Sequence, residues 1–225
     1  MKTATAIYLL ASTLLLAQEK ATDPFAPDPP ASLGSQPILP TNPPQPDDLR
    51  PRPETLKLLA EPSLEKLANA DQLPAIRLIW VRTFHAPISL RAYMSKDGPR
   101  LRVARTSGKG GYDWGKLNFE NDFALKQETW QQILNLLYAD EAREPFKHKP
   151  DARALLSGLD GAIWRLEVVD KSGYTVDEAS NPTIATDGKP EHTKALEDEG
   201  IHLANFVKLC KFLIQYAPMD EESIY

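Results

Sequence analysis

Cysteine is almost absent from this chain of 225 residues, which contains only Cys210. A single cysteine cannot form a disulfide within the chain, so stability has to come from a hydrophobic core. Cys210 lies in an apolar pattern of helical spacing, which indicates a buried small side chain rather than a reactive thiol. Histidine and cysteine pairs at metal-ligand spacing are also missing, so the sequence predicts no metal site and no cofactor.

An excess of positive charge is missing too. The chain has 26 Lys and Arg against 31 Asp and Glu, a formal net charge of −5. This balance argues against nucleic acid or an anionic membrane surface as the main partner. Basic residues are nevertheless concentrated between residues 77 and 109, where Asp97 is the sole acid. The simplest explanation is that these arginines pair with Glu and Asp across neighbouring strands.

A long apolar run occurs at the start of the chain. Lys2 is followed by an apolar stretch from Ala4 to Leu16, and Ala17 then precedes polar residues. A charged start, a run too short to span a bilayer and a small residue at its end are typical of a secretory signal peptide. We therefore expect residues 1–17 to be removed, leaving a secreted or periplasmic protein without stable membrane insertion.

Proline divides the rest of the chain. Eleven of the 20 prolines fall within residues 23–53, where apolar side chains are few, so residues 18–53 are predicted to form a disordered spacer. Leucines then recur at near-helical spacing, interrupted by Pro62, which predicts a short helical lead-in over residues 54–75. Residues 76–217 form the predicted domain, and residues 218–225 form an acidic tail.

The first part of the domain has the pattern of three antiparallel strands, 77–84, 88–94 and 101–106, separated by turn residues. Apolar and polar side chains alternate in these segments, which predicts a sheet with one apolar face and one solvated face. A helix over 126–139, two strands near 162–169 and 174–178, and a final helix over 203–217 complete the order β-β-β-α-β-β-α.

This order predicts an α+β fold. The economical arrangement is a single antiparallel sheet of about five strands with the two main helices packed on one face. Nothing in the pattern requires a second copy, so we expect a monomer. The runs WVRTFHAPISLR, GKGGYDWGKL, GLDGAIWRLEV and LCKFLIQYA, with the helix around Trp130, resemble a group of secreted bacterial domains without an assigned activity. The resemblance covers residues 76–217 and implies the same order of elements, but no catalytic residues.

Two functions of different classes fit these patterns. The favoured one is a non-catalytic binding or interaction module that recognises a protein, peptide or envelope polymer through its charged sheet face. The residues expected on that face are Arg91, Tyr93, Arg100, Arg102, Arg165 and Glu167.

The alternative is an extracytoplasmic hydrolase. His85, Asp113 and Asp160 adjoin turns and could provide a general base with carboxylate partners. The G-x-S-x-G elbow of many serine hydrolases is missing. The glycines around Lys109 do not have the spacing of a phosphate-binding loop, so we expect them to provide positive φ angles in a turn.

Overall fold

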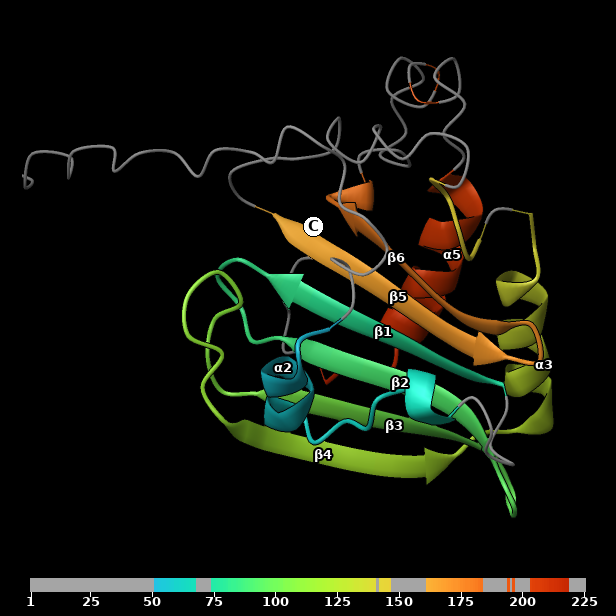
Figure 1. Cartoon of the computed structure of the whole chain (residues 1–225), viewed down its shortest axis with the longest axis horizontal. Coiled ribbons are helices and arrows are strands. Elements are labelled where there is room, and N and C mark those ends of the chain that lie inside the picture. The colour runs from blue at the N-terminus through green and yellow to red at the C-terminus, as the bar shows by residue number, and fades with distance from the viewer. Residues whose placement is uncertain are drawn as a thin grey trace, which may run out of the picture. The chain divides into compact units, whose positions relative to one another are not determined.

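A six-stranded antiparallel sheet forms the centre of the computed structural model (Figure 1). Its strands are β1 (Ala75–Arg82), β2 (Ile88–Ser95), β3 (Gly98–Thr106), β4 (Leu117–Ala124), β5 (Ala162–Asp170) and β6 (Gly173–Ser180). They lie side by side in the order β4-β3-β2-β1-β5-β6. The α+β fold with a single antiparallel sheet is therefore confirmed.

The structure describes residues 51–67, 74–140, 142–146, 161–183, 194, 196 and 203–218. The predicted signal peptide, nearly all of the predicted spacer and the tail from residue 219 lie outside these ranges. So does Asp160, one of the three residues of the hydrolase hypothesis.

Strand β4 is the element that the sequence pattern does not predict, which is why the expected number of strands is one too small. It lies at the edge of the sheet, and none of its residues is fully buried. An edge strand with little burial tolerates polar residues such as Asn118, Glu120 and Asn121, so its apolar alternation is weak.

The described helices are α2 (Pro53–Leu58), the short 3₁₀ helix η1 (Glu65–Leu67), α3 (Gln127–Leu137) and α5 (Leu203–Ile214). The helical pieces expected in the lead-in and the two main helices are thus present. None of the helices in the described ranges is both long and apolar enough to cross a membrane.

The main hydrophobic core joins one face of the sheet to α3 and α5. Strand register places Val103, Leu90, Leu78 and Leu166 in one row across β3, β2, β1 and β5. Trp164 belongs to the same core with no exposed surface, as the alternation in its strand predicts. Cys210 is also buried there, and burial raises the pKa of its thiol well above the usual value.

The opposite face of the sheet is covered by residues 51–67, which we call the N-terminal strap. Figure 1 shows α2 in front of the sheet and α5 behind it. Leu56 and Leu59 of the strap pack with residues of β1 and β3, and Leu64 packs against Ala75 and Val169. The prediction of a solvated sheet face is therefore wrong at the centre of the sheet, because the strap's leucines need burial and find it there.

Candidate functional site

Two regions hold the residues that the sequence singles out: the charged sheet face under the strap, and a cleft at one end of the sheet. On the sheet face, four of the six predicted binding residues are buried. Arg91, Arg102 and Glu167 are 8%, 4% and 1% exposed, and Tyr93 is 8% exposed. Arg100 and Arg165 remain partly exposed.

Strand register puts three arginines side by side on this face. Arg102 of β3 lies opposite Arg91 of β2, which lies opposite Arg77 of β1, and Arg77 lies opposite Glu167 of β5. Like charges directly opposite one another destabilise a sheet. The expected pairing of arginines with acids across strands is therefore wrong between β1, β2 and β3, and the balancing charge has to come from elsewhere.

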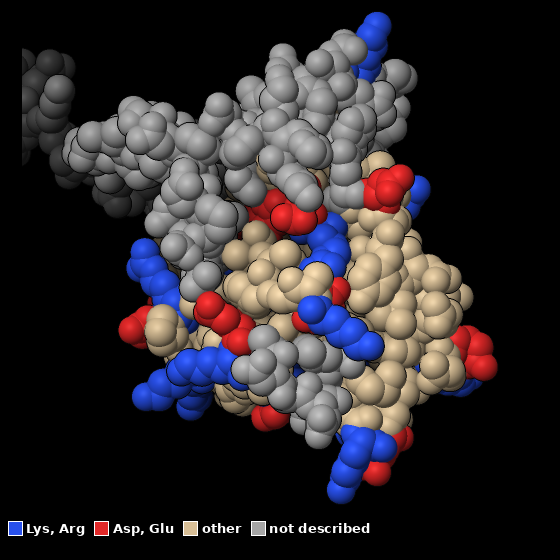
Figure 2. Space-filling view, turned by 45° about the vertical axis from the view of Figure 1, so that its right-hand side comes forward, with Lys and Arg blue, Asp and Glu red and all other residues tan. Residues whose placement is uncertain are grey.

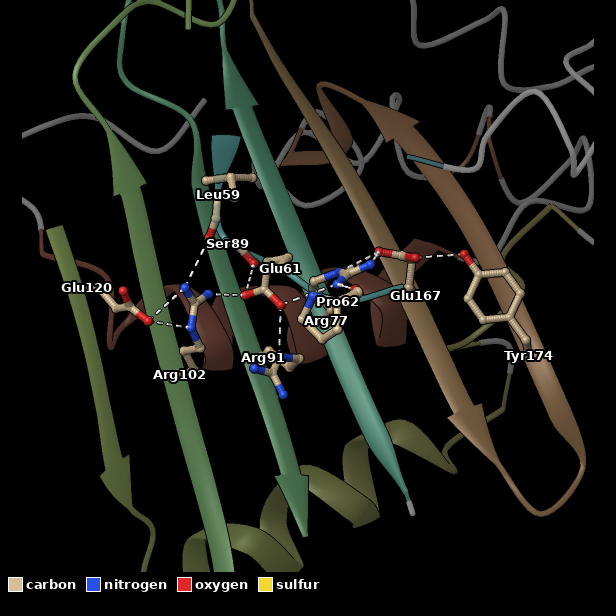
Figure 3. Close-up of polar contacts among 10 residues, drawn as sticks. All are labelled: Leu59, Glu61, Pro62, Arg77, Ser89, Arg91, Arg102, Glu120, Glu167 and Tyr174. Carbon is tan, nitrogen blue, oxygen red and sulfur yellow. Dashed lines mark hydrogen bonds and ion pairs between the residues drawn. The ribbon is translucent and has the colours of Figure 1, made fainter. Parts of the chain in front are cut away.

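Glu61 of the strap supplies that charge (Figure 3). Its Oε1 accepts hydrogen bonds from Nη1 of Arg102 and, at 3.0 Å, from the hydroxyl of Ser89. Its Oε2 accepts from Nε of Arg91 at 2.8 Å and from Nη1 of Arg77 at 3.3 Å. The side chain of Glu61 has no exposed surface, so one buried carboxylate joins all three arginines.

Further acceptors complete the network at both ends. Nε and Nη2 of Arg77 lie 2.6 Å from Oε2 of Glu167, whose other oxygen accepts from the hydroxyl of Tyr174 at 2.7 Å. Arg102 donates to Glu120 of β4 at 3.0 Å and to the carbonyl of Leu59 at 3.0 Å. Three carboxylates thus balance three arginines, and the strap is held by recognition of both its side chain and its main chain.

The partly exposed members of the predicted face are paired as well. Arg100 donates to Asp122 at 2.8 Å, and the hydroxyl of Tyr93 donates to the same carboxylate at 2.7 Å. Burial and this hydrogen bond raise the pKa of Tyr93. Arg165 donates to Glu178 at 2.7 Å. Figure 2 shows the same intermixing at larger scale, since acidic and basic side chains lie next to one another over the visible surface.

The second region is a cleft of about 580 Å³, which we call the end cleft. Its wall comes from the β1–β2 turn and from the glycine-rich loop after β3. His85 and Asp113 both line it, so the structure brings together two of the three residues of the hydrolase hypothesis. Phe84 and Tyr112 line it too, and they are exposed by 46% and 71%.

Main-chain hydrogen bonds lock the two loops of the end cleft together. The amide of Gly110 donates to the carbonyls of Arg82 and His85, and the amide of Gly111 donates to Thr83 at 2.9 Å. The amide of Thr83 also donates to the carbonyl of Gly161 at 3.0 Å, and Gly161 directly precedes β5. The turn is therefore held from two sides, and the cleft is preformed.

The glycines of this loop allow a close approach of main chains. A Cβ atom on Gly110 would lie 2.4 Å from the carbonyl oxygen of Arg82, and one on Gly108 would lie 1.9 Å from that of Asp113. Positive φ angles occur at Gly115 but not at these two residues or Gly111. The expectation that Gly108, Gly110 and Gly111 provide positive φ angles is thus wrong. Gly108 and Gly110 are required instead because neighbouring main chain leaves no room for a side chain.

Some polar groups in the end cleft form hydrogen bonds within the loop, and others have no such bond among the described residues. Oδ1 of Asp113 accepts from the amide of Gly115 at 2.9 Å, and Oγ of Ser107 accepts from that of Lys116 at 3.3 Å. The hydroxyl of Thr106 lines the cleft, is buried, and has no hydrogen-bond partner among the described residues. Such a hydroxyl is suited to a bound ligand or water.

Sequence reasoning did not single out Glu61, Arg77, Phe84 or Tyr112. Glu61 lies between Leu59 and Leu64 of the lead-in and belongs to no motif, so its one signal in the sequence is the unbalanced positive charge between residues 77 and 109. Phe84 and Tyr112 flank the turn and the glycine-rich loop, where the meeting of two distant segments is a tertiary feature. No model of a known protein family matches the sequence, and no curated protein matches it.

Proposed function

We propose that the protein is a non-catalytic, extracytoplasmic binding module whose ligand occupies the end cleft. Export rests on the apolar N-terminal run, and the binding role rests on the cleft. The charged sheet face, first expected to bind the partner, is occupied by the protein's own strap. Any ligand there would first have to displace Leu56, Leu59 and Glu61 from buried positions.

The observation that carries the proposal is the exposed aromatic pair on a locked scaffold. The rings of Phe84 and Tyr112 lie 6.2 Å apart at an angle of 34°. Large aromatic side chains that remain exposed lose apolar burial, and they are enriched where proteins bind partners. Because the main-chain bonds already hold both loops, ligand binding would require little further ordering.

The proposal can be tested with the full mature chain, labelled for NMR. The probes are soluble envelope components of separate classes: neutral glycan oligomers, acidic glycan oligomers, peptidoglycan fragments and peptides. We expect one class to shift the signals of Phe84, Lys109 and Tyr112 in a saturable way, and Tyr112→Ala to remove the effect. Tyr138→Ala is the control, since Tyr138 directly follows α3, is exposed and does not line the cleft.

If no class gives saturable shifts at the cleft, or if Tyr112→Ala binds as well as the wild type, the proposal is wrong. The hydrolase remains the second candidate, because His85 and Asp113 line the same cleft. It predicts that a bound probe is cleaved over time and that His85→Ala stops cleavage while leaving binding in place. Recovery of an intact probe, measured by mass spectrometry, would favour the binding module.

A further inference from the structure

The geometry of the end cleft points to a carboxylate-bearing glycan as its ligand. This inference rests on the proposed function and names the chemical class that the site would take. Three features support it: the amides of residues 106–111 are already used, two aromatic faces are available, and two cations form no ion pair with an acid among the described residues.

The main chain of the cleft offers little to a peptide or a phosphate. The amides of Thr106, Ser107, Gly108 and Lys109 donate to Pro87, Lys116, Trp114 and Asp113, and those of Gly110 and Gly111 donate to the turn. A peptide that adds a strand, or a phosphate held in a nest, needs such donors unoccupied. Recognition by residues 106–111 must therefore come from their side chains.

The aromatic pair suits a ligand made of rings. Phe84 and Tyr112 are the large hydrophobic residues of the cleft that remain exposed, and their tilted rings make a stepped apolar surface. The C–H face of a sugar ring can cover an aromatic face, burying apolar area while the sugar hydroxyls stay in water or bond to neighbouring polar groups. The exposed side chain of Asn118 is such a group.

The charges of the cleft favour an anion. Lys109 is exposed, and Nη1 of Arg105 donates to the neutral carbonyl of Pro218 at 2.9 Å. Within the described part of the chain, neither cation forms an ion pair with an acid, in contrast to the three arginines beneath the strap. Asp113 is the acid that lines the cleft, and its Oδ1 accepts a hydrogen bond from the amide of Gly115 in the loop. A ligand carboxylate would meet a net positive site.

The test measures, by calorimetry, the binding of a short oligomer of galacturonic acid to the full mature chain. The matched probe is the same oligomer with its carboxylates methyl-esterified. We expect the acid form to bind at the cleft and the ester to bind at least about tenfold more weakly, with a difference that shrinks as salt is raised. Lys109→Gln should weaken the acid form about threefold, and Lys126→Gln, a change of an exposed lysine outside the cleft, should leave it unchanged.

Other outcomes separate this inference from the proposed function. Equal binding of acid and ester would overturn the role of the cations. Binding of oligo-glutamate or single-stranded oligothymidylate as tightly as the sugar acid would overturn the choice of a glycan. In each of these cases a loss on Tyr112→Ala would still support a binding cleft. No binding of the sugar acid would overturn the ligand class, while the envelope panel decides the proposed function independently.

Discussion

Oε2 of Glu61 accepts a hydrogen bond of 2.8 Å from Nε of Arg91, 30 positions further along the chain. This contact ties the strap to the middle of the sheet. Without Glu61, Arg77 would keep Glu167 and Arg102 would keep Glu120, but Arg91 would have no carboxylate among its described contacts. The strap therefore contributes the charge that makes three adjacent arginines compatible in one sheet.

The first prediction concerns this carboxylate. Glu61→Gln should lower the free energy of unfolding by about 3–5 kcal/mol, because removing one partner leaves buried charge uncompensated. Chemical denaturation followed by tryptophan fluorescence measures the loss. Glu54→Gln, a change of an exposed glutamate on the same strap, should cost less than about 0.5 kcal/mol. A Glu61 variant as stable as this control would mean that the strap does not neutralise the arginines.

Much of the fold could be predicted because alternation and helical spacing are local signals. Leu90 and Trp164 lie on the face that their strands' patterns indicate, and the helix near Trp130 and the final helix are where their stripes put them. Strand β4 could not be found in this way, because an edge strand needs no strong apolar alternation.

The candidate site was harder to predict, for a physical reason. A polar face that alternates with an apolar one has the same pattern whether water or another segment covers it. Arg91 and Arg102 therefore fit a solvated surface in sequence, while Leu56, Leu59 and Glu61 bury them in the structure. The end cleft depends on the contact of residues near 83 with residues near 110. These segments are far apart in the sequence, so no local pattern predicts that they meet.

The second prediction concerns the core. Trp164→Ala should cost about 3–5 kcal/mol of unfolding free energy, because the indole is fully buried between the sheet and the helices of the core. Its neighbour Ile163 points to the other face and is 36% exposed, so Ile163→Ala should cost less than about 1 kcal/mol. If Trp164→Ala cost no more unfolding free energy than Ile163→Ala, the assignment of Trp164 to the buried face of β5 would be wrong.

The third prediction concerns acid. Burial alone would raise the pKa of Asp170, but hydrogen bonds from Ser172 and the charge of Arg143 outweigh it and hold the pKa below 3.8. Folding therefore favours the ionised form. The stabilisation is fully present above the pKa of the unfolded chain and is lost as pH falls through the lower pKa of the folded protein.

Asp170→Asn should accordingly cost about 1–3 kcal/mol at neutral pH, because it weakens charged hydrogen bonds. The difference from the wild type should narrow as the pH drops below about 4. Urea denaturation at a series of pH values gives both quantities, with Asp97→Asn at an exposed turn as the control. If the difference in unfolding free energy between the wild type and Asp170→Asn stayed constant or increased in acid, it would contradict the lowered pKa of Asp170.

The last prediction concerns the lock of the end cleft and needs no ligand. In Gly110→Ala the new methyl group would lie 2.4 Å from the carbonyl oxygen of Arg82 and 2.6 Å from Cγ1 of Val81. The loop has to move away, so the bonds from the residue 110 amide to Arg82 and His85 should break. Hydrogen exchange of the amides at residues 110 and 111 should then become faster, while exchange in the β1 core stays slow.

Lys116→Ala is the matched control in the same loop, because the side chain of Lys116 is exposed and its main-chain bond to Ser107 needs no side chain at residue 116. It should leave the exchange rates unchanged. If the cleft binds its ligand through a preformed surface, Gly110→Ala should also weaken that binding while Lys116→Ala keeps most of it. Faster exchange with undiminished binding would mean that the ligand does not depend on the locked arrangement of the two loops.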